Sequence, residues 1–213
     1  MPAKAPDILY RIGRYPDALK FPPWEYVGGE RFDDPERRFR VLYTAEQRIA
    51  CFVEALAPLR SPSYELAEIL DSMPAGEYGD DLPQTGIVPA DWHLKRLIGQ
   101  LRLGPEQQCL DLRSHETLAA LHVLMASDLR RLEIAELDMA AVQSHDYRVT
   151  QAVAQRAYST GYKAVAYTSR LGADLVCWAI FEEARFERVG VSQVIKRDDQ
   201  DLVQAAARFG LEL

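Results

Sequence analysis

The stretch from Arg148 to Glu183 constrains the fold most strongly, because it places a helix and two apolar strands one after another. The residues RVTQAVAQRAYST predict a helix, with Thr150 as its N-cap and Gly161 as its stop. The residues KAVAYTS then predict a strand, and a second strand, LVCWAIFEE, follows across a short turn at Gly172. Such a unit predicts a mixed α+β fold.

The N-terminal part of the chain predicts two further strands and a helix. DILYRIG alternates, so that Tyr10 and Arg11 point to opposite faces of a strand. A long loop rich in Pro and Gly follows, and loops of that length in compact domains are often functional. RVLYT predicts a strand, and Thr44 is predicted to cap a helix, with Gln47 completing a capping box and Pro58 following its end.

The rest of the sequence predicts shorter elements. SYELAEILDSM predicts a short helix, QQCLDLRS a buried strand leading to Ser114 as a helix cap, and AELDMAAVQ another helix. HLKRLIGQLRL has no firm assignment, RFERVGVSQVI is strand-like, and a last helix is expected from about Asp199 to Arg208. We therefore predict one α+β domain over residues 1–213, with mixed or antiparallel sheets, strands toward both ends and helices between them.

Composition narrows the class of protein. The chain has 213 residues and a formal net charge of -7, and its basic and acidic residues interleave, which disfavours nucleic-acid binding. No apolar run approaches a membrane span, and the start lacks a secretory signal, so we expect a cytoplasmic protein without membrane contact. Cys51, Cys109 and Cys177 are odd in number and lie in apolar sequence, which predicts buried free thiols.

Common catalytic motifs are missing from the sequence. There is no phosphate loop of the GxxxxGK[ST] type, no dinucleotide-binding glycine pattern and no GxSxG elbow. The four histidines show no metal-ligand spacing; His115 and His122 could share a helix face, but such a pair is usually only structural. We predict no metal site.

Arginines crowd the segment from Gly28 to Leu56 in a chain that is acidic as a whole. A solvated surface explains such a cluster, and so does a pocket for an anion, because a few local guanidinium groups suffice for one. Five residues are candidates for chemistry: Arg11, Arg31, Tyr43, Glu54 and Ser169. Each alone has an ordinary structural explanation, with Glu54, for example, lying off the apolar stripe of its helix. They converge on one cleft only if the two N-terminal strands are neighbours.

Three stretches resemble the RES domain, a family named for its arginine, glutamate and serine. They are YRIGRY, GGERFDDPERRFRVLYTAEQRIACFVEAL and TQAVAQRAYSTGYKAVAYTSRLGADLVCWAIF. Family members similarly have an Arg on a first strand, an Arg-aromatic pair after a Gly-rich turn, Tyr-x-Ala with a helical Glu, and later Tyr-x-Ser before a strand. The matching residues here are Arg11, Arg31-Phe32, Tyr43, Ala45, Glu54, Tyr167 and Ser169.

The chain departs from this pattern in two places. Asp33 stands where many relatives have Asn, and the block between Glu54 and Ser169 is longer than in compact members. Longer relatives have a similar helical insertion, so we interpret residues 58–148 as a helical elaboration within one domain.

The resemblance implies a fold related to the ADP-ribosyltransferases and an enzyme that consumes NAD+. Such an enzyme splits nicotinamide from ADP-ribose by phosphorolysis or hydrolysis, and some members are toxins neutralised by an antitoxin protein. Ordinary ADP-ribosyltransferases of the Arg-Ser-Glu type place a Glu-x-Glu after the serine strand. Here Glu54 precedes Ser169 and FEEARFE contains no Glu-x-Glu, which favours the RES interpretation.

On this hypothesis NAD+ is the substrate, phosphate is a candidate co-substrate, and no cofactor is needed. Arg11 and Arg31 would bind the pyrophosphate or an attacking phosphate, because guanidinium groups offer several planar donors. Glu54 would stabilise the oxocarbenium-like transition state. Tyr43 would contact a ring or the ribose, and Ser169 a hydroxyl or phosphate oxygen.

Two other classes of function stay open: a catalytically silent module that binds a nucleotide or a partner, and an ADP-ribosyltransferase acting on a macromolecule. An antitoxin partner and a homodimer are also left open by the sequence.

Overall fold

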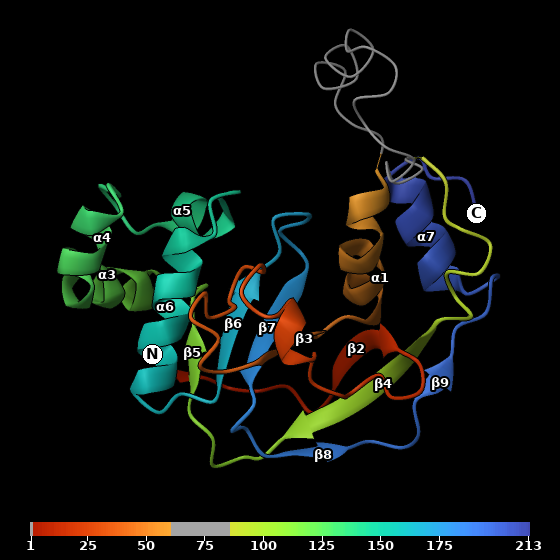
Figure 1. The fold of residues 1–213 in the computed structure, drawn as a ribbon, viewed down its shortest axis with the longest axis horizontal. Helices are drawn as coiled ribbons and strands as arrows, with labels where there is room; N and C mark the ends of the chain where they lie inside the picture. The colour runs from red at the N-terminus through yellow and green to blue at the C-terminus, as the bar shows by residue number, and fades with distance from the viewer. Residues whose placement is uncertain (1, 61–85) are drawn as a thin grey trace, which may run out of the picture.

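Strands from both halves of the chain meet in one curled sheet. In the computed structural model, which describes residues 2–60 and 86–213, nine strands pair in the order β1-β5-β6-β7-β3-β2-β4-β8, with β9 also on β4 (Figure 1). β5 and β6 are parallel and the other pairs are antiparallel, so the sheet is mixed. The strands are β1 (Pro2–Ala3), β2 (Leu9–Arg14), β3 (Val41–Ala45), β4 (Arg96–Leu103), β5 (Cys109–Asp111), β6 (Ala164–Thr168), β7 (Val176–Phe181), β8 (Phe186–Arg188) and β9 (Gln193–Val194).

Helices cover one face of this sheet. They are α1 (Arg48–Leu56), α3 (His115–Leu124), α4 (Ala126–Arg131), α5 (Met139–Gln143), α6 (Arg148–Ser159) and α7 (Gln200–Arg208), with the short 3-10 helices η1 (Trp24–Tyr26) and η2 (Ala57–Leu59). In Figure 1, α1 and α7 lie side by side at one end of the sheet, and α3 to α6 gather at the other. The prediction of a mixed α+β domain is confirmed.

The alternation of strand side chains separates two apolar clusters. On β2, Leu9 packs with Leu42, Leu101 and other residues of the face without helices, whereas Tyr10 and Ile12 pack against the cluster that includes the helices. Leu9 thus points away from Tyr10 and Ile12, as the alternation of strand side chains requires, while Arg11 lines the same cleft as Ile12.

Several predicted helix ends are correct. Ser114 caps α3, with its side chain accepting a hydrogen bond from the backbone N–H of Thr117, and Asp199 caps α7. α6 ends at Ser159, and Gly161 follows with a φ of +90°, a conformation that favours glycine. These signals are local, so they are readable from a few residues.

Two predicted N-caps are wrong. Thr44 belongs to β3 and its hydroxyl donates to the carbonyl of Trp178 (3.4 Å), because pairing with β7 continues to Ala45 and delays the helix until Arg48. Thr150 lies inside α6, where its hydroxyl donates to the carbonyl of Tyr147 (3.0 Å). Thr and Ser hydroxyls also form such bonds within helices, so the residue type alone does not fix a cap.

The prediction that residues 58–148 are a helical elaboration is wrong for two segments. β4 pairs with β2 at six positions and carries β8 and β9 on its other side, and β5 joins β1 to β6. Within the unassigned HLKRLIGQLRL, residues Arg96–Leu103 thus form the central strand β4, whose mixed apolar and basic composition gives no clear strand pattern in the sequence. The described helices of this block occupy residues 115–143, and the helix predicted at SYELAEILDSM lies outside the described residues.

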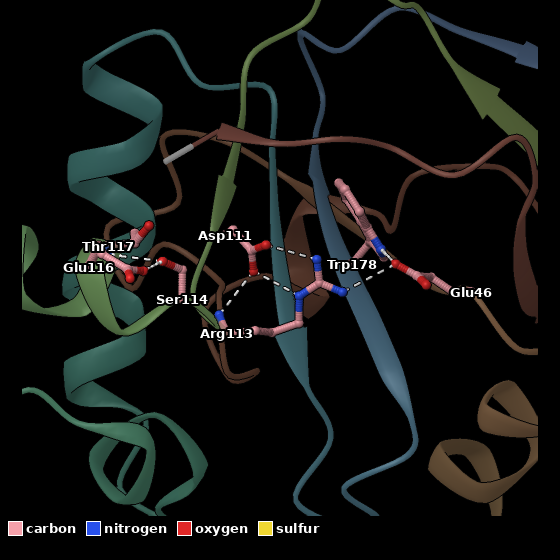
Figure 2. Close-up of polar contacts among 7 residues, drawn as sticks. All are labelled: Glu46, Asp111, Arg113, Ser114, Glu116, Thr117 and Trp178. Atoms are coloured by element: carbon pink, nitrogen blue, oxygen red, sulfur yellow. Dashed lines mark hydrogen bonds and ion pairs between the residues drawn. The ribbon is translucent and has the colours of Figure 1, made fainter.

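A cluster of polar side chains links the strands β3, β5 and β7 on the sheet face without helices (Figure 2). Arg113 donates to both carboxylate oxygens of Asp111 (2.7 and 2.8 Å) and approaches Glu46 (3.5 Å). Glu46 also accepts a hydrogen bond from the indole of the fully buried Trp178 (2.9 Å). The ends of β3 and β5 are therefore tied to the middle of β7.

Candidate functional site

A cleft of about 400 Å³ opens between β2, β3, β7, α1 and the loop that precedes β3. Four of the five predicted residues line it, namely Arg11, Arg31, Tyr43 and Glu54. They meet because β2 and β3 are neighbours, paired at Tyr10 and Ala45. Ser169 does not line the cleft, but it reaches the cleft through Glu54.

Glu54 and Ser169 form a direct pair across the cleft's inner wall. The hydroxyl of Ser169 donates to Oε1 of Glu54 (2.5 Å) and accepts a hydrogen bond from the backbone N–H of Leu171 (2.9 Å). Ser169 is only 1% exposed, so its hydroxyl is held in place. The thiol of Cys177 lies 3.8 Å from the same oxygen. Ser169 therefore holds the Glu54 carboxylate through a hydrogen bond, and its direct contact with a ligand stays a prediction.

Arg31 is a buried cation with an incomplete set of partners. It is 9% exposed; its Nη1 donates to the carbonyl of Val142 (2.5 Å), and its guanidinium lies over the ring of Tyr147 (4.6 Å). Its Nη2 is buried and has no hydrogen-bond acceptor within residues 2–60 and 86–213. An unsatisfied buried donor is costly, more so on a charged group, and a bound anion would satisfy it.

Arg11 is held from two sides. Its Nε donates to the carbonyl of Ala18 (2.9 Å) and its Nη1 to the carbonyl of Tyr43 (2.7 Å). Burial lowers the pKa of Arg11 to about 10, so the guanidinium still carries its charge at neutral pH. The cleft thus contains two fixed cations.

The hydroxyl of Tyr43 is engaged by the loop that carries Arg31. It donates to Oδ1 of Asp33 (3.0 Å) and accepts from the backbone N–H of Phe32 (2.9 Å). Burial, followed by the nearby Asp33, raises the pKa of Tyr43 well above its ordinary value, so the hydroxyl stays protonated. Tyr43 therefore presents its ring to the cleft and uses its hydroxyl to position the loop.

Asp33 has a structural role that the sequence did not reveal. Its second carboxylate oxygen accepts hydrogen bonds from the backbone N–H groups of Gly28 (2.9 Å) and Glu30 (3.1 Å). One buried carboxylate thus closes the Gly28–Asp33 turn from inside. The Asp-Asp pair after the Arg-aromatic pair was the available signal, since Asp commonly bonds nearby backbone N–H groups in turns.

Other cleft residues were not predicted. Glu30 lines the cleft, and burial, then Asp33 and Glu54, raises the pKa of its carboxyl. Tyr147 supplies the ring under Arg31, and Tyr26 and Arg170 also line the cleft. These residues come from separate segments, so no local pattern groups them.

The remaining arginines of the basic segment have other partners. Arg48 binds Asp199, the N-cap of α7, and Asp201 in its first turn; Arg40 binds Glu182 (2.8 Å), and Arg38 binds Asp34 (2.8 Å). Arg37 donates to the carbonyl of Val27 (3.0 Å). Of the clustered arginines, only Arg31 lines the cleft, so the explanation by an anion pocket concerns Arg31 alone and stays a prediction.

Within the part of the chain that the structure describes, no group of three or more His, Cys, Asp or Glu side chains could hold a metal ion. No helix there is both long and apolar enough to cross a membrane. The cysteines are buried free thiols, and Cys51 and Cys177 line the cleft.

The fold and the cleft define a mixed α+β domain with an arginine-lined cleft. A family model of the RES domain matches residues 8–203, so the chain belongs to the RES domain family. The fold is similar to a chain in the crystal structure of the M. tuberculosis MbcT-MbcA toxin-antitoxin complex, with a TM-score of 0.58 and 15% sequence identity. That likeness covers 98% of this chain and 91% of the other. No curated protein gives a significant match.

Proposed function

We propose that this protein cleaves the bond between nicotinamide and ribose in NAD+ and transfers the ADP-ribose group to phosphate or water. The observation that carries the proposal is the placement of Glu54, held by Ser169, in the same cleft as Arg31, whose buried Nη2 has no acceptor among the described residues. Membership of the RES domain family supports it.

The two arginines suit the pyrophosphate of the substrate. Arg31 offers a buried donor that no acceptor in the described part of the chain satisfies, and Arg11 is fixed by backbone carbonyls, so neither needs much ordering when an anion binds. Guanidinium groups bind phosphate oxygens through several N–H donors at once. The loop that carries Arg31 is held in advance by Asp33 and Tyr43.

Glu54 suits the charge that develops during cleavage. As the bond from C1′ of the ribose to the pyridinium nitrogen breaks, its electron pair leaves with neutral nicotinamide and the ribose becomes oxocarbenium-like. A nearby carboxylate stabilises that positive charge. A phosphate oxygen then bonds to C1′ and gives ADP-ribose 1′-phosphate; with water, a proton is released and ADP-ribose forms.

An antitoxin partner is part of the proposal. The similar chain from M. tuberculosis belongs to a toxin-antitoxin complex. A protein that depletes NAD+ in its own cell needs an inhibitor of this activity. The role of the partner would be to block the cleft.

The first experiment follows nicotinamide release from NAD+ by chromatography, with and without phosphate. Glu54→Gln should lower kcat by about 100-fold or more with little change in KM, because the substitution removes a charge needed mainly in the transition state. Arg31→Ala should mainly raise KM. Glu187→Gln on β8, an exposed glutamate outside the cleft, should match the wild type.

If the Glu54→Gln variant cleaves NAD+ at the wild-type rate, the proposed role of this carboxylate is wrong. If the wild type binds NAD+ in calorimetry but releases no nicotinamide, the protein is a nucleotide-binding module instead. Transfer of label from NAD+ to a macromolecule in cell extract would indicate an ADP-ribosyltransferase.

A further inference from the structure

An exposed aromatic side chain stands at the mouth of the cleft. Tyr26 lines the cleft and is 64% exposed. Its side chain makes no hydrogen bond and no ring contact with another part of the described chain. A large aromatic side chain exposed at a polar cleft is a common element of ligand recognition.

The backbone around Tyr26 is fixed on both sides. Trp24 lies against the guanidinium of Arg40 (4.9 Å), which is also bound to Glu182 (2.8 Å). Val27 is buried, and its carbonyl accepts a hydrogen bond from Arg37 (3.0 Å). Tyr26 is thus held at the surface by its neighbours, and a ligand that contacts its ring has little backbone to order.

The cleft combines charged side chains with an exposed aromatic ring at Tyr26. The buried residues Cys177 and Tyr167 line it near the Glu54 carboxylate, and Ser169, which does not line the cleft itself, donates a hydrogen bond to that carboxylate. Tyr26 is the exposed aromatic residue of the lining; Pro22, on the same loop, is half-buried, and the charged Glu30 and Arg170 also line the cleft. A flat, uncharged heterocycle fits against the exposed ring of Tyr26, whereas phosphates and the reacting ribose fit beside Arg31, Arg11 and Glu54.

We propose that Tyr26 is the stacking platform for the adenine base, so that the cleft selects a dinucleotide over a mononucleotide. This inference rests on the proposed function, which places the nicotinamide ribose at Glu54 and the pyrophosphate at Arg31 and Arg11. The pyrophosphate separates the two halves of NAD+, so the adenine half extends from the arginines toward the mouth. Stacking of a base on an aromatic ring is a substantial part of nucleotide affinity.

The test compares two substrates with the same scissile bond, NAD+ and nicotinamide mononucleotide. For Tyr26→Ala we expect the KM for NAD+ to rise about tenfold, with kcat unchanged and the KM for the mononucleotide unchanged. Tyr26→Phe keeps the ring and should restore the affinity for NAD+ that Tyr26→Ala loses. Tyr15→Ala is the matched control, because Tyr15 is also exposed (69%) but does not line the cleft.

A second measurement does not depend on turnover. ADP keeps the adenine and the pyrophosphate, and calorimetry should show that Tyr26→Ala binds it about tenfold more weakly than the wild type.

An unchanged affinity for ADP would overturn the inference even if NAD+ is cleaved. An equal rise in KM for both substrates would also overturn it, because the ring would then contact the nicotinamide half. Absence of nicotinamide release from wild type would contradict the proposed function, while the ADP result still decides the role of Tyr26.

Discussion

At the scale of single residues, two adjacent aspartates hold the loop that carries Arg31. Asp33 organises the turn before it, and Asp34 anchors the segment after it. Asp34 is fully buried and accepts hydrogen bonds from the backbone and side chain of Arg38 and from Gln155 on α6 (2.8 Å each for the closest contacts). Two neighbouring carboxylates thus connect the cleft loop to β3 and to α6.

The lowered pKa of Asp34 predicts that the folded protein loses stability in acid. Burial by itself raises the pKa of this carboxyl, but the hydrogen bonds from Arg38, Gln155 and the backbone of Glu36 outweigh it and lower the pKa from 3.8 to about 2. A depressed pKa means that the folded state binds the proton less tightly than the unfolded chain. The stabilisation, up to about 2 kcal/mol, is present above pH 4 and is lost as the pH falls toward 2.

Denaturant unfolding of the wild type and Asp34→Asn at several pH values measures this effect. The difference in unfolding free energy between them should be largest near neutral pH and shrink in acid. Asp146→Asn is the control: hydrogen bonds from Arg148 also lower the pKa of Asp146 to about 2, but this pair is exposed, where ion pairs contribute little, so the difference from the wild type should stay small at every pH. A difference for Asp34→Asn that does not change with pH would contradict the assigned role.

At the scale of elements, short-range signals determine where helices begin and end. Ser114 at the start of α3 accepts a hydrogen bond from the N–H of Thr117 (3.3 Å) and donates to the carboxylate of Glu116 (2.5 Å; Figure 2). α1 lacks such a cap: its N-cap is Gln47, whose side chain instead accepts from the N–H of Val176 on β7 (2.9 Å). The start of α3 is fixed locally, whereas the start of α1 is fixed by the sheet.

Ser114→Ala should destabilise the protein by about 1 kcal/mol, because it leaves an N–H group at the start of α3 without its side-chain partner. The midpoint of thermal or denaturant unfolding measures the change. Ser159→Ala, at the exposed end of α6, should change the unfolding free energy by less than about 0.5 kcal/mol. Equal effects of the two substitutions would show that the cap does not stabilise α3.

At the scale of the whole molecule, the cleft depends on a close approach between β2 and the loop that follows it. A Cβ built on Gly13 would meet the backbone of Ala18, with its Cα at 2.6 Å and its carbonyl oxygen closer still. That carbonyl also accepts the hydrogen bond from Arg11. The absence of a side chain at Gly13 therefore allows the contact that positions a cleft arginine.

Gly13→Ala should destabilise the fold by about 1–3 kcal/mol, because the backbone of Ala18 must move away. It should also raise the KM for the substrate, since the same movement displaces the partner of Arg11. The control is Gly29→Ala, measured for stability only: a Cβ at Gly29 meets nothing within 4 Å. Wild-type stability of Gly13→Ala would contradict the close packing at this position.

The sequence by itself determined the features that depend on neighbours a few residues away. These are the strands KAVAYTS and LVCWAIFEE, the Ser114 cap, the end of α6 near Gly161, and the ordered motifs that resemble the RES domain. Local propensity and side-chain periodicity act over such distances, so a single sequence contains them.

Only the tertiary structure decided which distant residues meet. Ser169 reaches Glu54 across 115 positions of sequence, and Arg31 reaches the carbonyl of Val142 across 111. The placement of β4 beside β2, and of Asp33 under Tyr43, likewise depends on strand pairing and burial. These contacts arise from the global packing of the chain, which the pattern of residues along any one segment does not contain.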